Sequence, residues 1–190
     1  MSGHSHWKQI QHKKGTADQK RGRLFSKLLA AIAIAARQET NPDFNPRLRS
    51  AVEKAKQNSV PGENIERAVK KAAELKNLEE ITIEAYGPEK SAMIIEAITD
   101  NRNRTISEIR HLLEENKAKM ADPRSVLWSF DPPTRLRGRS HFGEAKAREI
   151  PDWRPKFRQS ISEEGQRQLR VLMEKLEEHN DVQKIITNSL

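Results

Sequence analysis

Hydrophobic positions between residues 17 and 76 recur every three to four residues, which is the period of amphipathic helices. A first helix is expected to start at Ala17 and to end shortly before Pro42, which cannot continue it. Asn45 and Pro46 then form a helix start, with the asparagine as cap and the proline in the first turn. A third helix follows after a break in the pattern, so this segment is predicted to be a three-helix unit.

The first predicted helix has two chemically different faces. At about 100° per residue, Phe25, Leu28 and Ile32 lie on one side of it. Lys20 and Arg23 lie on roughly the opposite side. The helix therefore combines a face for packing with a basic face.

From Glu80 onward the pattern changes to the period of strands. Strands are expected at residues 81–85, 92–98, 125–130 and 182–187. A capping box is predicted to open a helix at Thr105, and Ser162 is predicted to cap a last helix. The predicted fold class is α+β, with an N-terminal three-helix domain that carries a basic arm, then a small ferredoxin-like α/β sandwich domain in the order strand-strand-helix-strand-linker-helix-strand.

Four segments are expected from these patterns. Residues 1–16 lack an apolar period and are predicted to be a basic N-terminal arm. Residues 131–160 hold four of the nine prolines and are predicted to be a basic linker. The helical domain is expected to span residues 17–78, and the α/β domain residues 79–130 plus 161–190.

The net charge of +8 is unevenly distributed along the chain. Residues 1–50 carry ten Lys or Arg against three Asp or Glu, and residues 131–160 carry eight against four. A basic segment that buries little apolar surface commonly binds nucleic-acid phosphate. The alternative is solvated charge that serves solubility.

The composition excludes several classes of function. Without cysteine the chain has no disulfide, thiolate zinc site, iron–sulfur cluster or cysteine nucleophile. No apolar run approaches the roughly 18 residues of a membrane span, and the N-terminus has no apolar signal region. We therefore expect a soluble cytoplasmic protein without a membrane partner. No Ser/His/Asp grouping, phosphate loop or mechanistic carboxylate pair is visible, so neither an enzyme nor a small-molecule substrate is expected.

Three histidines, His4, His6 and His12, raise the question of a metal. A free amine at Ser2 together with His4 would allow a square-planar copper or nickel chelate. No fourth-ligand set for zinc is apparent, so no metal and no cofactor is predicted, and assistance to RNA contact is the better interpretation.

Ten short motifs occur in one order along the chain. They are Ser2-Gly-His-Ser-His-Trp7, His12-Lys-Lys-Gly15, Lys20-Arg-Gly-Arg-Leu-Phe25, Phe44-Asn-Pro-Arg-Leu-Arg49, Glu53-Lys-Ala-Lys56, Asn64-Ile-Glu-Arg-Ala68, Tyr86-Gly-Pro88, Thr99-Asp-Asn-Arg-Asn-Arg-Thr105, Ser125-Val-Leu-Trp128 and Asp181-Val-Gln183. With these motifs the sequence resembles the YebC/PmpR family, which includes the mitochondrial translational activator of cytochrome c oxidase.

The resemblance implies a nucleic-acid-binding regulatory protein without enzymatic activity, of the kind usually described as a probable DNA-binding transcriptional regulator. The family also implies an alternative, a ribosome-associated translation factor that binds ribosomal RNA and eases elongation at difficult nascent sequences such as proline runs. Typical members carry a third domain where this chain has only residues 131–160. His6 stands where members usually have lysine, and Glu89-Lys90 where the turn is usually glycine-rich.

The candidate nucleic-acid-binding residues are basic or aromatic and lie mostly in the first 50 positions. They are His4, His6, Trp7, Lys8, Lys13, Lys14, Lys20, Arg21, Arg23, Lys27, Arg47, Arg49, Arg102 and Arg104. For the N-terminal group the alternative is a solvated tail with a packed tryptophan. For Arg47 and Arg49 it is pairing with Glu53 and Glu66, and for the last two arginines it is pairing inside the protein.

A second basic and aromatic stretch lies in the predicted linker. It comprises Arg135, Arg137, Arg139, Trp153, Arg154, Lys156, Phe157 and Arg158. This stretch either extends the nucleic-acid surface or is a linker without a role. No recognition helix with base-reading side chains is visible, which favours RNA, whereas the usual description of the family favours DNA. A protein-interaction scaffold is the third interpretation and would make the arm dispensable.

Overall fold

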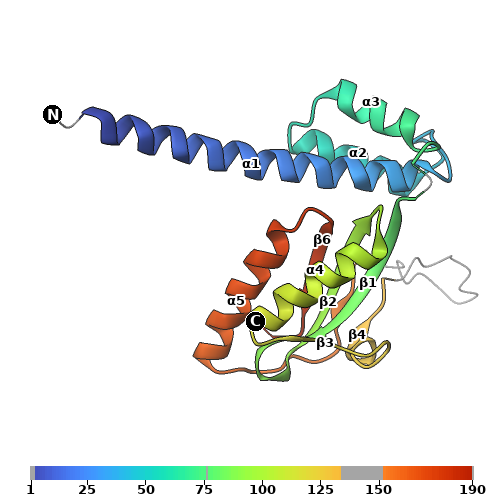
Figure 1. The fold of residues 1–190 in the computed structure, drawn as a ribbon. Helices are drawn as coiled ribbons and strands as arrows, with labels where there is room; N and C mark the ends of the chain where they lie inside the picture. The colour runs from blue at the N-terminus through green and yellow to red at the C-terminus, as the bar shows by residue number, and fades with distance from the viewer. Residues whose placement is uncertain (1–2, 76, 134–151, 190) are drawn as a thin grey trace, which may run out of the picture. The chain divides into compact units, whose positions relative to one another are not determined.

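The computed structural model describes residues 3–75, 77–133 and 152–189, with side chains from Ala17 onward (Figure 1). These residues form α1 (Gly3–Ala36), α2 (Pro46–Gln57), α3 (Gly62–Lys71), β1 (Glu79–Tyr86), β2 (Ala92–Thr99), α4 (Arg102–Glu115), β3 (Lys119–Met120), β4 (Phe130–Asp131), β5 (Arg154–Pro155), α5 (Glu163–Glu178) and β6 (Val182–Thr187). Two short 3₁₀ turns, η1 (Pro88–Lys90) and η2 (Leu127–Ser129), complete the list. The predicted fold class, α+β, is confirmed.

The chain divides into two compact units. One comprises Met1–Ile81, Ala97–Thr105 and Glu177–Gln183, and the other comprises Thr82–Glu96, Ile106–Leu176 and Lys184–Leu190.

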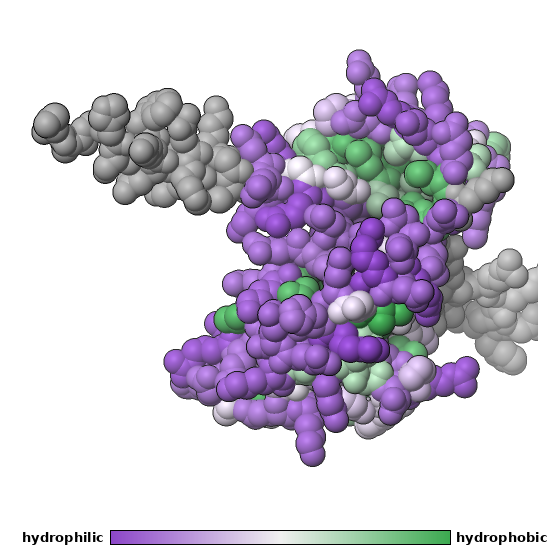
Figure 2. All heavy atoms as spheres, in the orientation of Figure 1, coloured by the Kyte–Doolittle hydropathy of each residue, from purple (hydrophilic) through white to green (hydrophobic). Residues whose placement is uncertain are grey.

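The three predicted helices at the start of the chain are confirmed as α1, α2 and α3. The second half of α1 packs against the other two through a core of small and branched apolar side chains, including Leu28, Ile32, Leu48 and Ile65. Figure 2 shows hydrophobic side chains gathered over this helical region on a face that is otherwise mostly hydrophilic. The core therefore holds the C-terminal half of α1 in place.

Asn45 joins the end of α1 to the start of α2. Its side-chain oxygen accepts the Leu48 N–H at 3.0 Å, as expected of a cap. Its amide nitrogen donates to the carbonyl oxygens of Ala35 and Glu39, both at 2.7 Å. The side chain is buried, so one residue caps α2 and satisfies one carbonyl in the last turn of α1 and another just after it.

The start of the first helix was predicted wrongly. It begins at Gly3 rather than Ala17 and covers most of the segment predicted to be the basic N-terminal arm. No proline interrupts residues 3–36, and adding residues to an existing helix is far less costly than starting one. The packed half of α1 therefore provides a nucleus from which the rest can extend, although that part lacks an apolar period.

The four-stranded sheet has the order β3-β1-β2-β6. β1 pairs with β3 in antiparallel fashion, with Ala85 opposite Met120. The apolar faces of α4 and α5 are buried, with Ile109, Leu113 and Leu172 fully inaccessible. Ser162 caps α5 as predicted, because its hydroxyl accepts the Gly165 N–H at 3.0 Å.

The helix predicted to open at Thr105 begins three residues earlier. α4 starts at Arg102, and its cap is Asn101, whose side-chain oxygen accepts the Arg104 N–H at 3.1 Å. The Thr105 hydroxyl instead bonds to the Thr99 hydroxyl at 2.8 Å and to Asp181. The capping-box prediction is therefore wrong, because an asparagine nearer the strand already serves as the cap.

The strand predicted at residues 125–130 is also wrong. Half of this segment is the 3₁₀ turn η2, and only its last residue, Phe130, belongs to a strand, β4. The strand beside β1 is β3, which has two residues. The Glu84 carboxylate accepts the backbone N–H groups of Arg124, Val126 and Leu127. Those groups are thus unavailable for a ladder, and the chain turns instead.

The predicted linker is paired at its two ends. β4 and β5 form a two-stranded antiparallel sheet, with Phe130 opposite Pro155 and Asp131 opposite Arg154. Trp153 is half-buried and donates its ring N–H to Glu96 at 2.9 Å. Arg135, Arg137 and Arg139 lie outside the described residues.

The turn between β1 and β2 has a backbone conformation that favours glycine. Glu89 and Lys90 have φ of 53° and 62°, in the left-handed region that favours glycine. The Glu89 carboxylate accepts hydrogen bonds from the Ser162 N–H and hydroxyl, which lowers its pKa. Glu89 therefore has a compensating contact, whereas the exposed Lys90 side chain has none among the described residues.

We expect Lys90→Gly to raise the free energy of unfolding by about 0.5 kcal/mol, because relief of left-handed strain exceeds the entropy cost of glycine. Chemical denaturation measures the change. Lys90→Ala is the matched control, since it removes the same charge but keeps the strained Cβ. Equal stability of the two variants would show that the φ of 62° carries no strain.

Candidate nucleic-acid interface

The described side chains of α1 begin at Ala17 and include four cations, Lys20, Arg21, Arg23 and Lys27. Lys20 is exposed and forms no ion pair with any residue in the described ranges. The Arg21 side chain is 67% exposed and pairs with Asp18 at 2.8 Å, one turn earlier. An exposed pair of this kind contributes little, so the Arg21 guanidinium can exchange this partner for another anion at small cost.

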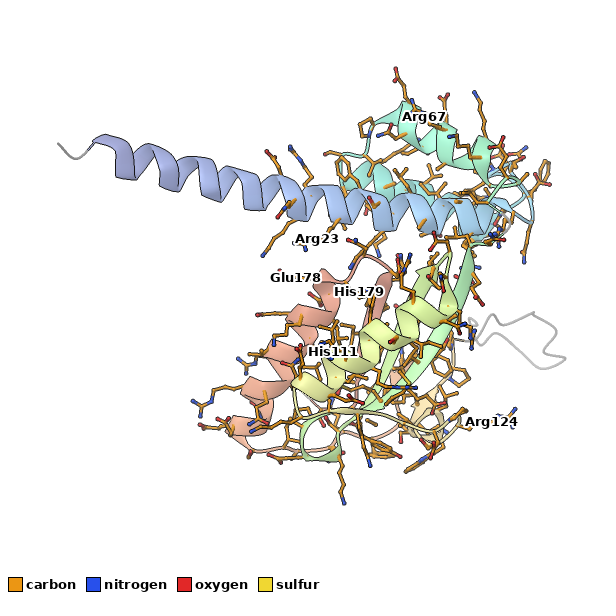
Figure 3. All side chains as sticks on the ribbon, viewed as in Figure 1. Arg23, Arg67, His111, Arg124, Glu178 and His179 are labelled. Atoms are coloured by element: carbon orange, nitrogen blue, oxygen red, sulfur yellow. The ribbon has the colours of Figure 1, made fainter. Side chains whose placement is uncertain are left out.

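Arg23 and Lys27, further along α1, contact the end of α5. The Arg23 guanidinium lies 3.9 Å from the Glu178 carboxylate, and both residues are labelled in Figure 3. Lys27 is half-buried and donates to the Glu177 carbonyl oxygen. Burial lowers the pKa of Lys27, and the Glu177 carboxylate acts in the opposite direction. These two cations are therefore less available to an external phosphate than Lys20 and Arg21.

The remaining N-terminal candidates lie on the first part of α1. Their side chains fall outside the described set: His4, His6, Trp7, Lys8, Lys13 and Lys14. By position, Lys13, Lys20 and Lys27 are spaced at seven-residue intervals, which is almost two turns of a helix. The helix therefore aligns one lysine position every two turns.

Arg47 and Arg49 on α2 are engaged within the protein. Arg47 forms an ion pair with Glu80, 33 residues along the chain. Arg49 donates to the carbonyl oxygens of Pro42 at 3.2 Å and Asp43 at 2.8 Å. The partners expected from sequence, Glu53 and Glu66, are not the ones observed. Both arginines hold the segment around the start of α2.

Arg102 and Arg104 in the first turn of α4 are also paired. Arg102 lies 3.3 Å from Glu79, and Arg104 lies 3.0 Å from Asp100 and 2.9 Å from Asp181. Burial alone would raise the pKa of Asp181, but hydrogen bonds from Thr105 and Arg104 outweigh it and lower the pKa. The protein's own carboxylate therefore occupies the anion position at this helix start.

Sequence reasoning passed over a second group of exposed cations, on α2 and α3. None of them forms an ion pair with a described residue: Lys54, Lys56, Arg67, Lys70 and Lys71. Four of the five stand in the last turn of their helix, where positive charge is favourable next to the helix dipole. That placement gives them a structural reason, and the lysine pairs Lys54/Lys56 and Lys70/Lys71 were the signal in the sequence that could have found them. Among the described residues, no helix has the length and apolarity to cross a membrane.

Two family models match the chain in succession. The model described as the TACO1/YebC protein N-terminal domain matches residues 5–75, and the model described as the TACO1/YebC second and third domain matches residues 78–140.

Curated relatives are about half identical to the matched part of the chain. A probable transcriptional regulatory protein of Desulfosudis oleivorans is 49% identical over 135 residues, which cover 69% of this chain and 55% of the relative. One of Chloroherpeton thalassium is 51% identical over 134 residues, which cover 68% of this chain and 54% of the relative. The chain thus spans about half the length of the curated relatives it matches.

A solved structure resembles the whole described fold. The crystal structure of a conserved hypothetical protein, Aq1575 from Aquifex aeolicus, has a TM-score of 0.78 and 34% sequence identity. The match covers 98% of this chain and 97% of that one.

Proposed function

Since this chain belongs to the TACO1/YebC family, whose curated members are named as probable transcriptional regulatory proteins, we propose that it is a regulatory protein that binds nucleic acid through the exposed basic residues of α1, with DNA as its target. The observation that carries this proposal is the pair of exposed cations, Lys20 and Arg21, on a part of α1 that packs against nothing in the helical core. The protein acts by binding and has no catalytic role.

The chemistry of α1 suits phosphate. A helix that carries cations at regular intervals can follow a phosphate backbone, and release of counterions drives such binding without any demand on sequence. On this proposal the N-terminal positions, from His4 to Lys14, extend the same contact along the helix. Arg23 and Lys27 lie at the end of this contact surface that is nearest the packed half of α1.

A second candidate target is ribosomal RNA. The described cations of α1 are phosphate-binding types, and phosphate contacts position a protein without distinguishing DNA from RNA. The absence of a recognition helix with base-reading side chains, predicted from sequence, supports this target, and ribosome association in translation would be the corresponding role.

The experiment compares two double variants with equal loss of charge. In Lys20→Gln with Arg21→Gln we expect weaker binding and a salt dependence whose logarithmic slope is smaller by about 2, since two phosphate contacts are lost. Lys70→Gln with Lys71→Gln is the matched control on α3, where both cations are exposed. Fluorescence anisotropy with a labelled DNA duplex over a range of salt concentrations gives both quantities.

The outcomes separate the two targets. Equal losses in both double variants would show that net charge rather than α1 determines binding. Co-sedimentation of the same proteins with ribosomes tests the second target. The target would be ribosomal RNA and not DNA if the α1 double variant no longer sediments with ribosomes while the two double variants bind duplex DNA equally.

A further inference from the structure

An aromatic pair, Trp128 and Phe157, lies exposed beside the two-stranded sheet. The two residues are 63% and 44% exposed, which is unusual for large hydrophobic side chains. Their ring centroids are 5.6 Å apart with an interplanar angle of 36°. Continuing the β4–β5 register by two residues places Phe157 opposite Trp128, and the Lys156 N–H donates to the Ser129 carbonyl at 2.9 Å. Backbone pairing thus fixes the two rings next to each other.

The loop that presents Trp128 is held by a buried carboxylate. Glu84 is 7% exposed and accepts three backbone N–H groups from residues 124–127, two of them at 2.7 and 2.9 Å. The same loop contains Arg124 with a φ of 68°, a strained conformation that persists only where its surroundings impose it. Beneath the loop, Val126 and Phe130 are buried in the core. The exposed indole therefore stands on a rigid support.

The indole is oriented as well as supported. Its ring N–H donates to the Ser125 carbonyl oxygen at 2.8 Å, and the Tyr86 hydroxyl donates to the same oxygen at 3.2 Å. The polar edge of Trp128 is thus bonded inside the protein, and what remains for a partner is the flat π surface. A preorganised ring loses little freedom on binding.

Several cations lie close to the two rings along the chain. Arg124, Lys156 and Arg158 are exposed and form no ion pair with a described residue, and Figure 3 shows Arg124 pointing away from the sheet. Asp122 is exposed in the same loop, and Asp131 lies opposite Arg154 in the register. A third carboxylate of these segments, Asp152, pairs with Lys184, so cations without an ion pair to a described residue outnumber the remaining carboxylates, which matches a polyanion better than a protein surface of mixed charge.

We propose that Trp128 and Phe157 form a stacking platform for the unpaired bases of a single-stranded nucleic acid, with Arg124, Lys156 and Arg158 contacting its phosphates. Aromatic faces bind bases of any sequence in this way, and nearby cations follow the backbone. The inference rests on the proposed function in taking nucleic acid as the partner, but it concerns a surface separate from α1.

The test uses substitutions that separate stacking from apolar contact. Trp128→Leu keeps an apolar side chain without a ring, whereas Trp128→Phe keeps a ring. We expect the leucine variant to bind a labelled short single-stranded RNA about 5- to 100-fold more weakly, and the phenylalanine variant to stay close to the original protein. An abasic strand of the same length keeps the phosphates and removes the bases, so its affinity should be equal for all three proteins. Thermal unfolding of each variant confirms that the loop remains folded.

Each outcome decides the proposal. Equal affinities of Trp128→Leu and the unsubstituted protein for the single strand would overturn the platform and leave a protein as the partner of this surface. A loss that is as large on the abasic strand would overturn stacking. Binding that falls in the α1 double variant but not in Trp128→Leu would retain the proposed function and reject the platform. If the unsubstituted protein binds no nucleic acid at all, both are wrong.

Discussion

Replacing Glu84 with glutamine is expected to lower the free energy of unfolding by about 3 kcal/mol. The carboxylate accepts three backbone N–H groups, all in the segment from Arg124 to Leu127. Glutamine has nearly the same shape but offers an NH₂ group in place of one acceptor oxygen. At least one buried N–H then faces another donor and loses its partner, and hydrogen bonds to a charged acceptor are the strong kind.

Urea denaturation of the variant measures this loss, and Glu96→Gln is the matched control. Glu96 lies on the neighbouring strand and accepts one hydrogen bond from the described residues, from the Trp153 ring N–H at 2.9 Å. Its replacement should cost less than about 1 kcal/mol, because an amide oxygen can still accept that bond. Similar losses for the two variants would show that the three backbone contacts of Glu84 contribute no more than one side-chain contact. A second expectation is that Glu84→Gln weakens single-strand binding, since the loop under Trp128 loses its support.

The second large effect is expected at Asn45. Asn45→Ala should lower the free energy of unfolding by about 2–3 kcal/mol, because it removes the cap of α2 and leaves the carbonyls of Ala35 and Glu39 without their buried donor. The residue lies at the junction of α1 and α2, so its loss affects two helices. Denaturation followed by circular dichroism reports this directly, since the signal is dominated by helices.

Two further variants separate the roles of Asn45. Asn45→Asp keeps the oxygen that accepts the Leu48 N–H but places a carboxylate against two carbonyl oxygens, so it should be at least as destabilising as alanine. If aspartate instead restores stability, the two carbonyl bonds contribute nothing. Asn58→Ala removes one hydrogen bond, from the side-chain amide to the Lys54 carbonyl oxygen at the exposed end of α2. The free energy of unfolding should fall by less than about 1 kcal/mol.

Local signals in the sequence predicted much of this fold. The caps at Asn45 and Ser162 were predicted correctly because each depends on residues within three positions. The segment at 125–130 was predicted wrongly because its backbone bonds to Glu84, some 40 residues earlier, and nothing in a short window indicates that contact. Asn101 was missed as the cap of α4 because Thr105 carried a stronger local pattern.

The sequence predicted which basic residues the candidate interface contains, but not which of them are free to bind an external anion. A basic face on α1 follows from spacing, but which cations are engaged depends on distant partners. Arg47 pairs with Glu80, and Arg104 reaches Asp181 across 77 residues. Lys20 and Arg21 lack such long-range partners among the described residues. The exposed ring of Trp128 likewise depends on a register between β4 and β5 that no local pattern indicates.

The pairing of β4 with β5 brings the two ends of the segment that connects them close together. Asp131 and Arg154 are partners in the ladder, and opposite residues of such a pair lie only about 5 Å apart. The chain therefore departs from this unit and rejoins it at nearly the same place. Residues inserted between Pro133 and Asp152 would leave the Trp153–Glu96 bond in place and would add mainly the closure entropy of a longer connection, which grows slowly with length. Residues can therefore be inserted here without separating β6 from the four-stranded sheet.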